Sequence, residues 1–189
     1  MANFIIPDNF LSRTDMKQEA LQSYRIPLTD CVTHDQVATV LPTAAANDDL
    51  GLITGTFGTT GPSLRTSDAK ATTVTQYARV QIPLPVEYDD GQSISLAIAA
   101  DMETTVSDGT ATIDVEAYLN GAGDDICATA AQSCNALTTA TLTYVITPTG
   151  ISTGDLLDIR LTAAITDSAT GTAVIAQITS IILKLDIRG

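Results

Sequence analysis

Apolar and polar residues alternate with a period of two in six runs along the second part of the chain. The runs cover residues 74–82, 93–100, 110–119, 138–147, 155–166 and 172–187. Successive side chains of a strand point to opposite faces, so each run predicts a strand with one buried face. Such strands, joined by short turns and without helical periodicity between them, predict an all-β protein with an antiparallel β-sandwich. An eight-stranded jelly roll fits if residues 124–134 supply a further strand.

The last run changes its buried face partway along. Val174 and Ile178 share one parity, whereas Ile181 and Leu185 share the other. A regular strand cannot keep both pairs on one face, because its side-chain period is two. We therefore expect a β-bulge near Thr179-Ser180, or a strand that passes between two packed surfaces.

The beginning of the chain lacks this alternation. We expect residues 1–70 to form an extended N-terminal arm and residues 71–189 to form the β-sandwich domain. The arm contains four prolines and a single short helix candidate at residues 15–24, where apolar residues recur at helical spacing. A segment of this kind rarely folds alone, so we expect it to order against its own domain or against a neighbouring molecule.

The charge balance restricts the partners. The chain has 9 Lys and Arg against 22 Asp and Glu, a net charge of -13, of which -3 falls on residues 1–70 and -10 on residues 71–189. Such acidity repels phosphate backbones and anionic lipids, so we expect no nucleic-acid partner and no membrane partner. The sequence also shows no signal peptide and no apolar span, which predicts synthesis in the cytoplasm.

The cysteines and the single histidine offer little chemistry. We expect Cys31, Cys127 and Cys134 to be free thiols, with a Cys127–Cys134 disulfide as the alternative under oxidising conditions. Zinc sites as a rule use four nitrogen or sulfur ligands, and His34 lies far along the chain from the second and third cysteines. We expect no metal and no cofactor.

One pair of carboxylates has a spacing that suggests catalysis. Asp114 and Glu116 lie two residues apart on the polar face of a predicted strand, as the acid and base of a glycoside hydrolase would. Sugar sites generally add stacked aromatic rings, and this chain has no Trp and only five Tyr. Two solvated strand charges are the better interpretation.

Three further motifs have structural explanations. Asp89-Asp90-Gly91 and Asp124-Asp125 suit calcium ligation but lack the alternating spacing of an EF-hand loop, so turns are favoured. The Gly-rich run at residues 51–61 lacks the Gly-Lys-Ser/Thr ending of a phosphate loop. His34 lies beside Asp35 without a nucleophile motif and is interpreted as a surface histidine. We therefore expect a protein that is not an enzyme.

The polar faces of the predicted strands are unusual in composition. The chain contains 30 Thr and 25 Ala, and these residues, not Lys and Glu, occupy many outward positions. A free monomer usually guards exposed sheet faces with charge. Small, neutral faces instead favour packing against another subunit or against the arm. The positions concerned are Ser93, Ser95, Ala97, Ala99, Thr112, Thr141, Thr143, Thr162, Ala164 and Thr166.

A set of motifs marks turns and strand ends between about residues 45 and 189. The motifs are Asp48-Asp49-Leu50-Gly51, Tyr77-Ala78-Arg79, Ile82-Pro83-Leu84-Pro85, Tyr88, Gly91 and Gly154-Asp155-Leu156-Leu157-Asp158. In these motifs the chain resembles the capsid decoration (cement) and virion structural proteins of tailed bacteriophages, and the similarity marks turns without marking functional residues.

This resemblance implies a jelly-roll protein, commonly a homotrimer, that binds the major capsid protein on the outer surface of the virion. Arms that reach over neighbouring capsomers would add contact area and avidity. We expect the apolar residues near the start of the arm to make capsid contacts, because they precede any core pattern. These residues are Phe4, Ile5, Ile6, Phe10 and Leu11.

Three alternatives remain open at this stage. A head-fibre or receptor-binding module would use the sandwich to recognise a host glycan. A glycan hydrolase would depend on Asp114 and Glu116. A major capsid protein is disfavoured, because the chain is short and its acidity does not suit a lumen packed with DNA.

Overall fold

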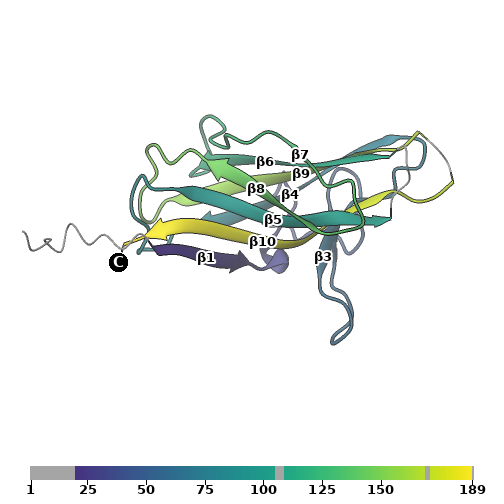
Figure 1. Ribbon diagram of the computed structural model, residues 1–189, viewed down its shortest axis with the longest axis horizontal. Coiled ribbons are helices and arrows are strands. Elements are labelled where there is room, and N and C mark those ends of the chain that lie inside the picture. The colour runs from purple at the N-terminus through teal and green to yellow at the C-terminus, as the bar shows by residue number, and fades with distance from the viewer. Residues whose placement is uncertain (1–19, 105–108, 169–170, 189) are drawn as a thin grey trace, which may run out of the picture.

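The computed structural model describes residues 20–104, 109–168 and 171–188 and confirms the β-sandwich. Two antiparallel sheets form its layers (Figure 1). Sheet A has the strand order β2-β3-β10-β5-β8, with β1 paired to β10, and sheet B has the order β4-β9-β6-β7. The strands are β1 (Ala20–Ile26), β2 (Gly51–Ile53), β3 (Ser63–Arg65), β4 (Thr73–Pro83), β5 (Ile94–Thr104), β6 (Thr110–Leu119), β7 (Gln132–Ser133), β8 (Ala140–Ile146), β9 (Leu156–Thr166) and β10 (Ile175–Ile187).

The alternation predicts the long strands well. All six runs become strands in which most of the predicted inward positions are buried, and the irregular segment supplies the two-residue strand β7. The predicted bulge is also confirmed, because the register of β10 against β5 shifts between Ile178 and Ser180. Among the described residues no helix is long and apolar enough to cross a membrane.

The core between the sheets is almost entirely aliphatic. Leu96, Ile98 and Leu183 of sheet A face Ile113 and Leu161 of sheet B, and each is at most 1% exposed. Tyr144 of β8 adds one polar link, since its hydroxyl donates a 2.6 Å hydrogen bond to the carbonyl of Ile113 in β6. This bond fixes the two sheets relative to each other and satisfies a buried hydroxyl.

The predicted helix at residues 15–24 is wrong over residues 20–24, and residues 15–19 lie outside the described part. Residues 20–24 belong to β1, which pairs antiparallel with β10 from Ala20 opposite Ile187 to Ile26 opposite Ile181. The helical stripe is short, so the backbone hydrogen bonds and the apolar face offered by β10 outweigh it. The one helix described is the 3-10 turn η1 (Leu28–Asp30).

Residues 20–70 order against their own domain. Besides β1, strand β3 pairs with β10, and β2 pairs with β3. Leu28, Leu50 and Leu64 are buried in the same core as the long strands. The side chain of Gln76, 2% exposed, links two parts of this segment by accepting from the Ser67 amide and donating to the Asn47 carbonyl.

All three cysteines are free thiols. Burial raises the pKa of Cys31 to about 12 and that of Cys134 to about 11. Burial also raises the pKa of Cys127. Because the thiolate is the reactive form, these cysteines are poor nucleophiles near neutral pH.

Candidate functional site

The outer face of sheet A carries small, uncharged side chains at its centre. We call its central part, on β5, β8 and β10, the neutral face. Cross-strand pairing aligns Ile182 with Ala97 and Ala97 with Thr143, and the next row aligns Lys184, Ser95 and Val145. The neutral face consists of Ser95, Ala99, Thr141, Thr143, Val145 and Ile182 around Ala97, which their side chains leave only 3% exposed.

The edge strand of this face is held in place by the segment before it. The amide of Ala128 donates to the Val145 carbonyl over 2.8 Å, and the Val145 amide donates to Thr129 Oγ1 over 2.9 Å. The Val145 side chain itself is 50% exposed. The edge therefore offers side chains to a partner, while its backbone groups around Val145 are already bonded.

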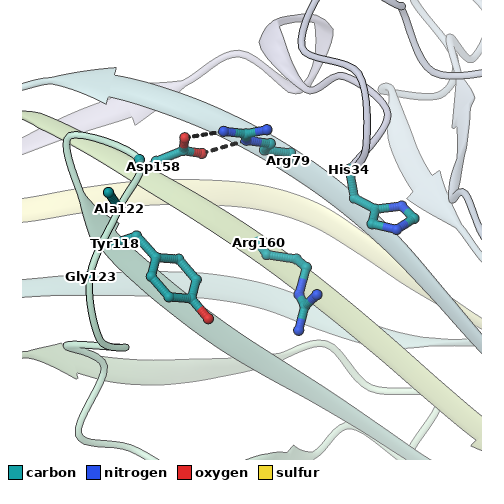
Figure 2. Close-up of a pocket in the computed structure, with 8 residues that line it drawn as sticks. His34, Arg79, Tyr118, Ala122, Gly123, Asp158 and Arg160 are labelled. Carbon is teal, nitrogen blue, oxygen red and sulfur yellow. Dashed lines mark hydrogen bonds and ion pairs between the residues drawn. The ribbon is translucent and has the colours of Figure 1, made fainter.

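The outer face of sheet B has a different character. Charged and aromatic side chains from β4, β6 and β9 gather there with His34 in what we call the polar cluster. Five of its members, His34, Arg79, Tyr118, Asp158 and Arg160, line a pocket of about 340 Å³ together with the turn at residues 121–123 (Figure 2). The polar cluster consists of His34, Tyr77, Arg79, Glu116, Tyr118, Asp158 and Arg160.

Arg79 and Asp158 form the most buried ion pair of the polar cluster. Arg79 Nε donates to Asp158 Oδ1 over 2.6 Å and Arg79 Nη2 binds Asp158 Oδ2, which makes the contact bidentate. Gln81 Nε2 donates a third hydrogen bond over 3.0 Å. The hydrogen bond from Arg79 lowers the pKa of Asp158 in spite of burial, and the carboxylate side chain is only 4% exposed.

A second cation lies beside this pair. Arg160 pairs with Glu116, and its guanidinium carbon lies 5.2 Å from the centroid of the Tyr77 ring. Tyr118 donates to the same glutamate over 3.4 Å. The buried Nε of Arg160 has no hydrogen-bond partner in the described part of the chain, so this donor is left unsatisfied.

The turn after β6 closes one side of the pocket. Asn120 and Gly121 both have positive φ, of 54° and 74°. A Cβ at Gly121 would lie 3.0 Å from Asp158 Oδ2, so the close approach of this turn to the buried carboxylate requires glycine.

His34 stands at the other side of the pocket and is not the surface histidine that the sequence predicts. Its side chain is 18% exposed, its ring lies 4.6 Å from that of Tyr77, and its two nitrogens lie 3.4 Å from carboxylate oxygens of Asp48 and Asp49. His34, Asp35 and Asp49 place possible metal-ligand atoms within 4.8 Å of one another. The ring stacking and the two carboxylates already account for the position of His34.

The other acidic and Gly-rich motifs that the sequence offers as possible sites are engaged in structural contacts. Asp114 and Glu116 share the outer face of β6 as predicted, but Glu116 is engaged by Arg160, and Asp114 accepts from the adjacent Val115 amide. The other acidic motifs have turn roles. Asp90 accepts from Thr153, and Asp125 accepts from the amides of Ala117 and Cys127. The Gly-rich run forms the β2–β3 hairpin.

The predicted capsid contacts lie outside the described residues, in the first 19 positions of the chain. They are Phe4, Ile5, Ile6, Phe10 and Leu11.

Sequence reasoning missed the polar cluster. Its signal is present, since Arg79, Asp158 and Arg160 occupy outward positions of strands whose other outward residues are mostly small and neutral. The sequence pattern does not say which strands are neighbours, however. Only the pairing of β4 with β9 and of β9 with β6 brings these side chains together.

Comparison with known proteins supports the fold. No family model and no curated protein matches the chain. A xylan-binding module of the CBM15 type is similar in structure, with a TM-score of 0.50 and 14% identity over 90% of this chain and 100% of that chain. Infectious bursal disease virus, Gt strain, gives a TM-score of 0.40 and 15% identity over 89% of this chain and 32% of that chain.

A third similar structure is the enzymatically active domain of bacteriophage CBA120 tailspike protein 4. It gives a TM-score of 0.40 and 12% identity over 86% of this chain and 19% of that chain. The solved structures similar to this chain thus include a carbohydrate-binding module and viral proteins. At these identities the likeness to the xylan-binding module shows a shared β-sandwich fold.

Proposed function

We propose that this protein is a decoration (cement) protein of a virion, which binds and stabilises the major capsid protein on the outer surface of the shell as a homotrimer. The observation that carries the proposal is the neutral face. On a chain with net charge -13, a sheet face made of Ser, Ala, Thr, Val and Ile is suited to burial against another protein. The resemblance of the turn motifs to decoration proteins supports the same role.

The distribution of charge agrees with an exterior position. Most of the acidity, -10, falls on residues 71–189, and it keeps an assembled surface soluble while repelling nucleic acid and anionic membranes. Such a protein acts through its surfaces and needs no catalysis, no metal and no cofactor. It would be made in the host cytoplasm and join the shell there.

Removal of residues 1–12 tests the proposed capsid contacts. We expect the truncated protein to keep its oligomeric mass and to lose co-sedimentation with empty shells of the virus that encodes it, because the apolar residues of this segment would be the anchors. A full-length variant with Asp8→Asn, in the same segment, is the control and should bind normally. If empty shells capture the truncated protein as well as the full-length protein, residues 1–12 do not contact the capsid.

The polar cluster favours a second candidate function, recognition of a host glycan by a head-fibre or receptor-binding module. Guanidinium and carboxylate groups beside the Tyr118 ring offer the hydrogen-bonding edges and the apolar face that a sugar needs. In that case Tyr118→Ala should weaken binding on a glycan array at least tenfold, whereas Thr75→Ala on the same sheet face should not. Glycan binding without capsid capture would select this function over decoration.

A further inference from the structure

The β2–β3 hairpin is the most prominent projection of the described structure (Figure 1). Its tip presents Phe57 with its side chain fully exposed. The chain has only three Phe, and the other two lie in the first ten residues. Phe57 is therefore the one phenylalanine of the described residues, and the fold places it in solvent although it would suit an aliphatic core.

Hydrogen bonds and a required glycine fix the backbone of the hairpin tip around Phe57. The Thr56 amide donates a hydrogen bond to Thr60 Oγ1 over 2.8 Å. The amides of Thr59 and Thr60 both donate to the Thr56 carbonyl over 2.9 Å. Gly55 has a φ of 73°, and a Cβ there would lie 2.3 Å from the Thr60 carbonyl oxygen. A hydrogen-bonded turn that requires glycine and presents an exposed aromatic ring is suited to act as a preorganised anchor.

We propose that the hairpin docks on the neutral face of a second copy of this chain, with Phe57 packing beside Val145. The sheet order places the hairpin and β8 at opposite edges of sheet A. A contact between opposite edges of identical subunits is head-to-tail, and such contacts close into rings when the rotation permits. This inference deepens the proposed homotrimer and rests on that part of the proposed function.

Charge favours a second copy as the occupant. Two copies of net charge -13 repel each other, but residues 51–64 of the hairpin carry no charge, and the neutral face carries none itself and is bordered by Lys184 in the row of Ser95 and Val145. At the base of the hairpin, Arg25 and Arg65 line a hollow of about 330 Å³. Arg65 pairs with Glu103, whereas Arg25 has no ion-pair partner in the described ranges and would face the acidic neighbour.

Light scattering on the full-length protein tests the docking. We expect wild type at roughly three times 19.7 kDa, and both Phe57→Asp and Val145→Asp at the mass of one chain. Val86→Asp, at a side chain that is 74% exposed and outside both surfaces, is the matched control and should keep the wild-type mass. All three variants should keep the wild-type fold by circular dichroism, because these side chains lie at the surface, and the two monomeric variants should lose only the thermal stability that assembly adds.

Mixing the two monomeric variants tests whether the contact is head-to-tail, with the hairpin of one copy on the neutral face of another. Phe57→Asp retains an intact face and Val145→Asp retains an intact hairpin, so an equimolar mixture should form dimers, each with one intact junction. No dimer, or a Phe57→Asp variant that keeps the wild-type mass, would overturn the inference. Capsid capture is measured separately, so an oligomer that is unaffected by these variants and still binds shells would leave the decoration role standing.

Discussion

Replacement of Arg79 by Met should destabilise the fold by about 3 kcal/mol at neutral pH, as measured by denaturant unfolding. Asp158 is almost fully buried and accepts two hydrogen bonds from Arg79, so the variant leaves a buried carboxylate with Gln81 as its remaining side-chain donor. An uncompensated buried charge costs far more than the pair contributes. Methionine keeps the apolar stem, so the loss reports on charge and hydrogen bonding.

The effect should depend on pH in a defined direction. The pKa of Asp158 is lowered in the folded state, so its contribution to stability is present above the unfolded pKa and is lost as the pH falls through the lower folded pKa. The difference between wild type and Arg79→Met should therefore be largest near neutral pH. It should narrow as the pH falls below the ordinary carboxyl range and through the lowered folded pKa of Asp158, where protonation removes the buried charge in wild type as well.

Two further variants separate this pair from ordinary surface charge. Lys70→Met removes a 3.3 Å pair with Asp68 whose side chains are 48% and 31% exposed, and it should cost about 0.5 kcal/mol or less. Adding Asp158→Asn to Arg79→Met should recover part of the lost stability, since the buried charge is then absent. An Arg79→Met variant no less stable than Lys70→Met would contradict the assigned role.

Replacement of Gly51 by Ala should cost about 3 kcal/mol or more. Gly51 begins β2, and a Cβ there would lie 2.3 Å from the Ala45 nitrogen and 2.6 Å from the Ala44 carbonyl carbon. These are backbone atoms, so the clash cannot be relieved by turning a side chain. The strand or the turn before it must shift, which disturbs the attachment of residues 20–70 to the sandwich. Denaturant unfolding and proteolysis at this segment measure the loss.

Gly61 provides the control for this substitution. It lies in the same hairpin, a Cβ there meets no atom within 4 Å, and its φ is outside the left-handed region. Gly61→Ala should therefore be neutral or slightly stabilising, by up to about 1 kcal/mol through the unfolded chain. Equal stability of the two alanine variants would show that the close packing at Gly51 is not required.

The sequence predicts the fold wherever side-chain alternation reports directly on burial. The six long strands follow from it. The change of parity in the last run predicts a bulge at Thr179-Ser180 or a strand between two packed surfaces, and the register shift between Ile178 and Ser180 shows the bulge. The helix predicted over residues 20–24 is wrong, since their short apolar stripe gives no information about the partner strand β10. Strands of three residues, such as β2 and β3, are too short to show a period.

The two candidate surfaces differ in how far the sequence predicts them. The neutral face follows from the Ala and Thr at outward positions such as Ala97 and Thr143, which local alternation identifies. The polar cluster depends on strand order, since Arg79 and Asp158 are 79 residues apart in sequence and meet only through pairing of β4 with β9. Exposure of Phe57 likewise depends on the tertiary position of the hairpin.

The central claim, a capsid-bound oligomer, is tested most directly by one combined measurement. The molar mass of the purified protein is measured by light scattering. The protein is then titrated onto empty shells of the virus that encodes it, and the bound protein is quantified after sedimentation. We expect a trimer in solution and saturable capture at a fixed ratio to the major capsid protein. A monomer that no shell captures at any concentration would contradict it.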